Sequence, residues 1–176
     1  DWSSDVCSSD LKQGKGALAV MHPQHVAASV RKAIASRNQL DSAEVDDIIW
    51  GTSAPVGAKS GDLARMAALD AGYDLRASGV TLDRFCGSGI TSVNLAAGMI
   101  MSGMEDLMIA GGTEMMSMPS RRLGDGPPMM DSGNLRLRDS HPQSHQGVCA
   151  DAIATMEKIS RQALDGLAAE KIGRAH

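Results

Sequence analysis

The stretch over residues 79–112 limits the possible folds more than any other part of this sequence. It reads as a strand over 79–85, a Cys-Gly-Ser-Gly turn, a helix over 90–101 and a second strand over 106–111. The first strand is rich in Val, Thr and Leu, the helix is apolar on every face, and the second strand is a continuous apolar run. This order predicts a buried helix packed against two strands of one sheet.

The residues before this stretch continue the same alternation of elements. Apolar residues at every fourth position predict an amphipathic helix over 22–37, with a proline tolerated in its first turn. A β-branched run over 45–51 predicts a strand, and the pattern over 61–71 predicts a helix that a glycine ends. Helix and strand therefore alternate three times, which predicts an α/β layered domain with a largely parallel sheet that contains all three strands.

The two ends of the chain read as translations of one DNA sequence from opposite strands. The run Val6-Cys7-Ser8-Ser9-Asp10-Leu11 can be encoded by DNA whose reverse complement, in a shifted frame, encodes Ile172-Gly173-Arg174-Ala175-His176. Such inverted identity is expected of a sequencing adapter that flanks an insert. We therefore expect residues 1–11 and 171–176 to be adapter-derived tails that do not pack against the core, with neither Trp2 nor Ile172 buried.

Composition excludes several classes of protein. Outside the terminal tails the chain has two cysteines, Cys86 and Cys149, which is too few for a disulfide framework and predicts a reducing, cytoplasmic setting. Seventeen basic and 21 acidic residues, with aromatics at 2%, give no reason to expect a nucleic-acid partner. Gly, Ser, Asn or charged residues interrupt the longest apolar stretches, so we expect no membrane span.

The character of the chain changes after the third predicted strand. Residues 119–147 are rich in Pro, Gly, Ser and Arg without a clear period, as in binding loops and lids. A helix over 148–158 follows, and Ser160 is the predicted N-cap of a last helix through residue 167. We therefore place a boundary near residue 119, between an α/β domain over 12–118 and a second region over 119–170.

Cys86 is the principal candidate for chemistry, because it lies at the predicted turn from strand to helix. Helix N-termini offer unpaired N–H groups and a positive dipole end, which favour a thiolate. The flanking Gly87 and Gly89 would let a bulky substrate approach the backbone, and the N–H of Cys86 itself would help to hold an oxyanion. On position alone, a buried cysteine that acts as a small hydrophobe explains the pattern equally well.

The surrounding motifs favour the first interpretation. The run Leu82-Asp83-Arg84-Phe85-Cys86-Gly87-Ser88-Gly89 resembles the nucleophile motif of the thiolases. The run Leu107-Met108-Ile109-Ala110-Gly111-Gly112-Thr113-Glu114-Met115-Met116-Ser117 resembles the strand and turn that follow in that family. Residues 51–68 and 145–165 resemble the segments upstream and downstream, so the likeness covers essentially all of 12–170.

The resemblance implies a thiolase-like layered fold. By this likeness, residues 12–118 are the N-terminal α/β domain with its first strand truncated, and 119–170 begin the loop domain that contacts CoA. His145 and Gln146 fall where the family contacts the pantetheine arm of CoA, which implies a substrate-binding role. Family members form homodimers or homotetramers.

The resemblance also implies a two-step acyl transfer. The Cys86 thiolate takes the acyl group from an acyl-CoA, and the acyl-enzyme then condenses with a second CoA thioester, or the reverse reaction cleaves a 3-ketoacyl-CoA. CoA thioesters are the substrates and no cofactor is required. In the family, a histidine and a second cysteine move the protons, and both come from C-terminal motifs that lie beyond this sequence. We therefore expect this chain to be inactive alone.

The sequence departs from the family pattern at two positions. Asp83 and Asp62 stand where many members have Asn. These changes put the fine specificity of those positions in doubt, and we expect neither to touch the Cys86 turn.

Several alternatives remain open at this level. One is a metal site formed by three residues at intervals of four, although a proline and a glycine between them argue against one unbroken helix: His141, His145 and Cys149. A dinucleotide-binding module would need a third small residue and an acidic group at the end of the next strand, and here Glu105 and Asp106 precede that strand. A ketoacyl synthase-like enzyme and a non-catalytic thiolase-like protein that binds lipid or CoA are the closer rivals.

Overall fold

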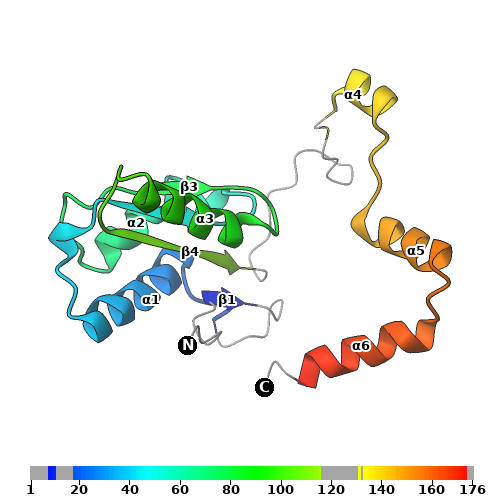
Figure 1. Cartoon of the computed structure of the whole chain (residues 1–176), viewed down its shortest axis with the longest axis horizontal. Helices are drawn as coiled ribbons and strands as arrows, with labels where there is room; N and C mark the ends of the chain where they lie inside the picture. Colours follow the sequence, from blue (N-terminus) through cyan, green and yellow to red (C-terminus); the bar gives the residue numbers. More distant parts are fainter. Residues whose placement is uncertain (1–7, 11–17, 116–130, 132, 174–176) are drawn as a thin grey trace. The chain divides into compact units, whose positions relative to one another are not determined.

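A computed structural model describes residues 8–10, 18–115, 131 and 133–173, and the chain divides into two compact units, Asp1–Arg121 and Arg122–His176 (Figure 1). Strands and helices alternate in the first unit, as the sequence predicts. Its elements are β1 (Ser8–Asp10), α1 (Pro23–Asn38), β2 (Asp47–Gly51), α2 (Leu63–Asp70), β3 (Val80–Leu82), α3 (Ser88–Met101) and β4 (Met108–Met115).

The four strands of this unit form one parallel sheet in the order β1-β4-β2-β3. In the register, Trp50 of β2 lies beside Gly111 of β4 on one side and Thr81 of β3 on the other. The predicted α/β class and single sheet are confirmed. The bounds of all three predicted strands differ from the prediction: β2 begins at Asp47, β3 ends at Leu82 and β4 continues to Met115.

One face of the sheet is closed by α1 and α2. Ile48, Trp50 and Ile109 point to this face and pack on alanines of the two helices, among them Ala27 and Ala64, both fully buried. Trp50 fills the space over β4: its Nε1 donates to Thr113 Oγ1 at 2.9 Å, and a Cβ on Gly111 would lie 2.6 Å from its ring. A large strand side chain therefore sets a limit on the size of its neighbours.

The same core encloses a charged residue, Arg31 of α1, whose side chain is fully buried. Its guanidinium lies 4.1 Å from the centroid of a Trp50 ring and donates one hydrogen bond to the carbonyl of Ala64. Its Nε and Nη2 have no hydrogen-bond partner among the residues that the structure describes. Burial disfavours the charged form and lowers the pKa of Arg31 to about 10.

The opposite face carries α3, and here the sequence prediction was wrong in one respect. The helix lies against β2 and β4, and the side chains it buries there are small: Ser88, Thr91, Ser92 and Ala96. Its larger apolar residues point away from the sheet, with Ile90 72% and Met101 87% exposed. An apolar surface on every side predicts burial only when both sides have partners, and among the described residues α3 has one on the sheet side alone.

The described residues of the second unit form three helices, α4 (Leu135–Ser140), α5 (Gln146–Met156) and α6 (Arg161–Gly173). Up to residue 170 the side chains of these helices are exposed or half-buried, so none of the three has a buried face over that range. Ser160 caps α6 as predicted, because its Oγ accepts the N–H of Ala163 at 3.2 Å. The expected boundary near residue 119 lies outside the described residues.

The expectation for the N-terminal tail was wrong for three residues. Ser8–Asp10 form β1 and pair with β4 over Thr113 to Met115. Such pairing uses backbone groups only, so the open edge of β4 accepts a strand whose side chains carry no apolar pattern. Trp2 and the side chain of Ile172 lie outside the described part of the chain. Within that part, no helix is both long enough and apolar enough to cross a membrane.

Candidate active site

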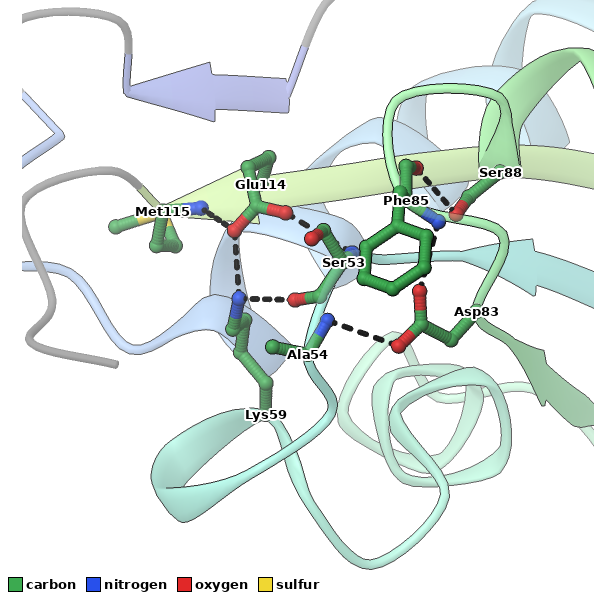
Figure 2. A network of polar contacts seen from close by, with 8 residues as sticks. All are labelled: Ser53, Ala54, Lys59, Asp83, Phe85, Ser88, Glu114 and Met115. Carbon is green, nitrogen blue, oxygen red and sulfur yellow. Dashed lines mark hydrogen bonds and ion pairs between the residues drawn. The ribbon is translucent and has the colours of Figure 1, made fainter. Parts of the chain in front are cut away.

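The site lies where three parallel strands end at the same edge of the sheet. Figure 2 shows the loop after β2, the turn after β3 and the last residues of β4 joined by polar contacts. The carboxyl ends of parallel strands are the usual place for ligand sites in open α/β sheets. Cys86 belongs to the second of these segments.

Cys86 is exposed and precedes the helix start by two residues, since α3 begins at Ser88. The strand does not run to the cysteine as expected, because β3 ends at Leu82 and three residues of the turn lie between it and Cys86. Phe85 has a φ of 48°, in the left-handed region. This conformation is unfavourable for a residue with a Cβ, and it breaks the extended strand just before the cysteine.

The backbone N–H groups after the cysteine divide into two sets. The N–H of Gly87 donates to the carbonyl of Arg84 at 3.0 Å, and that of Ser88 to Phe85 at 3.1 Å. The first bond of the helix runs from Thr91 N–H to the Gly87 carbonyl. Among the described residues, the N–H groups of Gly89 and Ile90 therefore have no acceptor. Of the two glycines expected to let a substrate approach the backbone, Gly87 donates its N–H within the turn, whereas the N–H of Gly89 has no acceptor in the described part of the chain.

Ser88 closes the turn that carries Cys86. Its Oγ donates to the Phe85 carbonyl at 2.7 Å and accepts the N–H of Arg84 at 2.8 Å. Its backbone lies directly on β2, because a Cβ on Gly51 would come within 2.7 Å of the Ser88 carbonyl carbon. The start of α3 is thus fixed both to the turn and to the sheet.

Asp83 takes part in the Cys86 turn, contrary to the sequence-based expectation. Its Oδ1 accepts the N–H of Phe85 at 2.9 Å, and its Oδ2 accepts the N–H of Ala54 at 3.2 Å (Figure 2). The first contact is the local turn that aspartate commonly forms with the N–H two residues ahead. The second reaches a loop 29 residues earlier in the chain, which the sequence alone does not indicate.

A partly buried ion pair holds the neighbouring loop. Lys59 Nζ lies 2.6 Å from Glu114 Oε1 and 2.5 Å from the carbonyl oxygen of Ser53. Glu114 also accepts the N–H groups of Ser53 (2.9 Å) and Met115 (3.0 Å). These extra hydrogen bonds satisfy a pair whose desolvation would otherwise be costly. The sequence does not indicate this pair, because its members stand 55 residues apart without a pattern that relates them.

Glu114 also bears on the dinucleotide alternative, which needs an acidic group at the end of a strand. Glu114 does stand near the end of β4, where the sequence analysis expected no strand. Its carboxylate oxygens are already engaged by Lys59 and by two backbone N–H groups, and this carboxylate is not free to bind a ribose.

Asp62, the second departure from the family pattern, ties α2 to β3. Its φ is 57°, and its Oδ1 accepts the Thr81 hydroxyl at 2.7 Å and the N–H of Arg65 at 3.4 Å. It therefore caps α2 and does not reach the Cys86 turn, as expected.

The expected CoA-contacting residues lie in the second unit. His145 is the N-cap of α5, and its Nδ1 accepts the N–H of Gly147 at 3.1 Å. Gln146 is the first residue of that helix, and Cys149 lies on it with an exposed side chain. His141 follows the end of α4, so the three residues considered as metal ligands do not share one helical face.

Comparisons with known proteins extend this picture. Residues 7–176 match the family described as thiolase, N-terminal domain. A steroid 3-ketoacyl-CoA thiolase of Mycobacterium tuberculosis is 41% identical over 88 residues, which are 50% of this chain and 22% of that protein. A 3-ketoacyl-CoA thiolase of Shewanella loihica is 38% identical over 90 residues, 51% of this chain and 23% of that protein.

A third relative is the 3-oxoadipyl-CoA/3-oxo-5,6-dehydrosuberyl-CoA thiolase of Escherichia coli, 41% identical over 89 residues, which are 50% of this chain and 22% of that protein. The matched segment thus spans less than a quarter of the length of each of these relatives. The family match extends over almost the whole sequence, and the fold has the parallel α/β arrangement that the resemblance implied. The chain belongs to the thiolase family, as part of its N-terminal domain.

Proposed function

We propose that the chain contributes the nucleophile of an acyl-CoA C-acyltransferase, and that Cys86 is this nucleophile. The observation that carries the proposal is the position of an exposed cysteine two residues before the start of a 14-residue helix. The second and third N–H groups of this helix, those of Gly89 and Ile90, have no acceptor in the described chain. Unpaired N–H groups and the helix dipole stabilise negative charge at this point.

The proposed first step is transfer of an acyl group from CoA to Cys86. The Sγ thiolate attacks the thioester carbonyl carbon, and the negative charge moves to the carbonyl oxygen, which the free N–H groups stabilise. The C–S bond to CoA then breaks, CoA leaves as a thiolate and takes up a proton, and a Cys86 thioester remains. In the second step this thioester condenses with the carbanion of another CoA thioester, or the reverse sequence cleaves a 3-ketoacyl-CoA by thiolysis.

We propose that the proton-transfer groups lie outside the described residues. His25 pairs with Asp70 at 3.2 Å, and His145 caps α5, so each has a local structural contact. A nucleophile without its base is much weakened. We therefore propose that this chain forms the acyl-enzyme slowly and shows little turnover alone. His145 and Gln146 are proposed to bind the pantetheine arm of CoA, and the whole protein to be a homodimer or homotetramer.

The direct test is mass spectrometry of peptides after incubation of the 176-residue chain with acetyl-CoA. We expect an acetyl group on Cys86, labile to hydroxylamine, that accumulates at least about tenfold faster than any label on Cys149. Cys149→Ser should keep this label and Cys86→Ser should lose it. Equal labelling of both cysteines, or preferential labelling of Cys149, would contradict the proposed nucleophile.

A further inference from the structure

We propose that Asp83 is a positioning residue for Cys86: its carboxylate holds the turn that presents the cysteine and fastens that turn to the loop after β2. This inference rests on the proposed role of Cys86 as the acyl acceptor. It assigns to Asp83 a function that the replacement of Asn by Asp in the family motif does not by itself indicate.

The first observation concerns two strained residues. Ala54 and Phe85 each have a φ of 48°, and the N–H group of each donates to the carboxylate of Asp83. The left-handed conformation brings Cβ close to the following carbonyl oxygen, so alanine and phenylalanine adopt it only where their surroundings enforce it. One side chain therefore supplies part of the enforcement at both places.

The second observation is the location of these contacts relative to Cys86. Phe85 directly precedes the cysteine and is held at both ends, because Asp83 accepts its N–H and Ser88 binds its carbonyl oxygen. The direction of the chain through Cys86 is thereby fixed. On the other side, Ala54 follows Ser53, whose N–H is bound by Glu114 at 2.9 Å. Asp83 thus fastens the turn to the loop after β2, and Ser53 of that loop is in turn bound to the end of β4.

The carboxylate of Asp83 fits this arrangement better than the side-chain amide of an asparagine would. A carboxylate is an acceptor at both oxygens, and here it faces two N–H donors. Asparagine has one acceptor oxygen and one NH₂ group, so it would satisfy a single N–H and place donor against donor at the other. The second tether, to Ala54, therefore requires the aspartate.

A positioning role and a purely electrostatic role of Asp83 predict opposite effects on the reactivity of Cys86 when the negative charge of Asp83 is removed. A carboxylate close to a thiol disfavours the thiolate, so an electrostatic role alone predicts that Asp83→Asn makes Cys86 more reactive. Acyl transfer from CoA also requires Sγ and the free N–H groups to face the same carbonyl. A positioning role therefore predicts slower acylation when Asp83 is replaced, although a small electrophile would react nearly as before.

The experiment compares Asp83→Ala, Asp83→Asn and Asp46→Asn in the 176-residue chain. Asp46 is the matched control, because it also accepts two backbone N–H groups, from Asp106 at 2.9 Å and Leu107 at 2.8 Å, at the opposite edge of the sheet. Three rates are measured on peptides: acetylation of Cys86 by acetyl-CoA, alkylation of Cys86 by iodoacetamide relative to Cys149, and amide hydrogen exchange at Ala54 and Phe85. Circular dichroism checks that each variant keeps its fold.

We expect Asp83→Ala to slow acetylation at least about tenfold and Asp83→Asn to slow it less, with alkylation within about threefold of the parent. Exchange at Ala54 should accelerate in both variants, and Asp46→Asn should leave all three rates unchanged. Acetylation that is unchanged or faster in both Asp83 variants would overturn the inference and leave the proposed function standing. Absence of acetylation at Cys86 in the parent chain would overturn the proposed function. Independently of that result, unchanged hydrogen exchange at the amides of Ala54 and Phe85 in the Asp83 variants would show that Asp83 does not hold the turn.

Discussion

The two faces of the parallel sheet differ in how the helices that cover them use large and small side chains. On the α1 and α2 face, the strands contribute large side chains, such as Ile48 and Trp50, that pack on helical alanines and on Leu63 of α2. On the α3 face, the helix offers small residues to the sheet and directs large ones away from it, such as Ile90 and Met101. The first face is a closed hydrophobic core. On the second face the backbones of α3 and the sheet lie close together, and the outer side of α3 is an exposed apolar surface. Stability should therefore depend unequally on the two faces.

The largest effect is expected where the first face is closed. Leu63→Ala removes a fully buried side chain of α2 and should lower the free energy of unfolding by about 3 kcal/mol. Denaturant unfolding followed by Trp50 fluorescence, in a Trp2→Phe background, measures this change. Leu75→Ala is the control, since Leu75 is 79% exposed, and should change the free energy by less than about 0.5 kcal/mol. Equal losses from both variants would refute the assignment of the core.

Two glycine substitutions test the α3 face, and they should change the free energy of unfolding in opposite directions. Gly51→Ala forces a Cβ to within 2.7 Å of the Ser88 backbone and should destabilise by about 1–3 kcal/mol. Gly98→Ala lies in the exposed interior of α3, where an added Cβ would meet no described atom within 4 Å apart from the helix's own backbone, and it should stabilise by about 0.5–1 kcal/mol. Thermal unfolding resolves both changes. A shift of the same sign in the two variants would show that α3 does not lie on β2 as described.

Arg31 is a buried charged residue in the otherwise apolar core on the α1 and α2 face of the sheet. Arg31→Met keeps much of the side-chain volume and removes a buried charge with two unsatisfied nitrogen atoms, so it should raise the free energy of unfolding by about 1 kcal/mol. The same change at the exposed Arg37, in the last turn of α1, should lower it by about 0.3 kcal/mol through the helix dipole. Chemical denaturation of the two variants gives the comparison. Destabilisation by Arg31→Met would mean that its contacts with Trp50 and Ala64 outweigh its desolvation.

The smallest effect is expected on the outer surface of α3. Met101→Gln replaces a side chain that is 87% exposed by one of similar helix propensity, and should change the free energy of unfolding by less than about 0.5 kcal/mol. Denaturant unfolding at several protein concentrations measures it. A loss above about 1 kcal/mol, or a dependence on concentration, would show that this surface is covered in solution.

Periodicity was sufficient to predict most elements of the first unit, because α1, α2 and the three strands each carry a pattern of their own. It failed for the environment of α3, since apolar residues on every side say nothing about which side has a partner. It also failed for β1, whose pairing depends on backbone groups and the open edge of β4. Cys86 and its helix start follow from a local motif, and Asp62 remained outside the turn as expected.

The remaining contacts of the site could not be predicted for a different reason. Asp83 to Ala54 and Lys59 to Glu114 join segments that the fold alone brings together. Only the local contact from Asp83 to Phe85 had a signal in the sequence, an aspartate two residues before the bound N–H. The difference between Asp83 and the usual Asn pointed to the right position, but the prediction that Asp83 does not touch the Cys86 turn was wrong. The effect of a second acceptor oxygen depends on the N–H of Ala54, and the sequence does not show that this donor lies nearby.

The close approach of β2, β4 and α3 also limits which sequences this fold can accept. A Cβ at Gly111 would meet the Trp50 ring at 2.6 Å, one at Gly112 would meet the Gly51 carbonyl oxygen at 2.7 Å, and one at Gly51 would meet Ser88. In a library that samples every amino acid at these three positions, selection for folded protein should return glycine almost alone. Recovery of a side chain at Gly111 should require a smaller residue at Trp50 in the same clone, so the two positions should vary together or remain fixed.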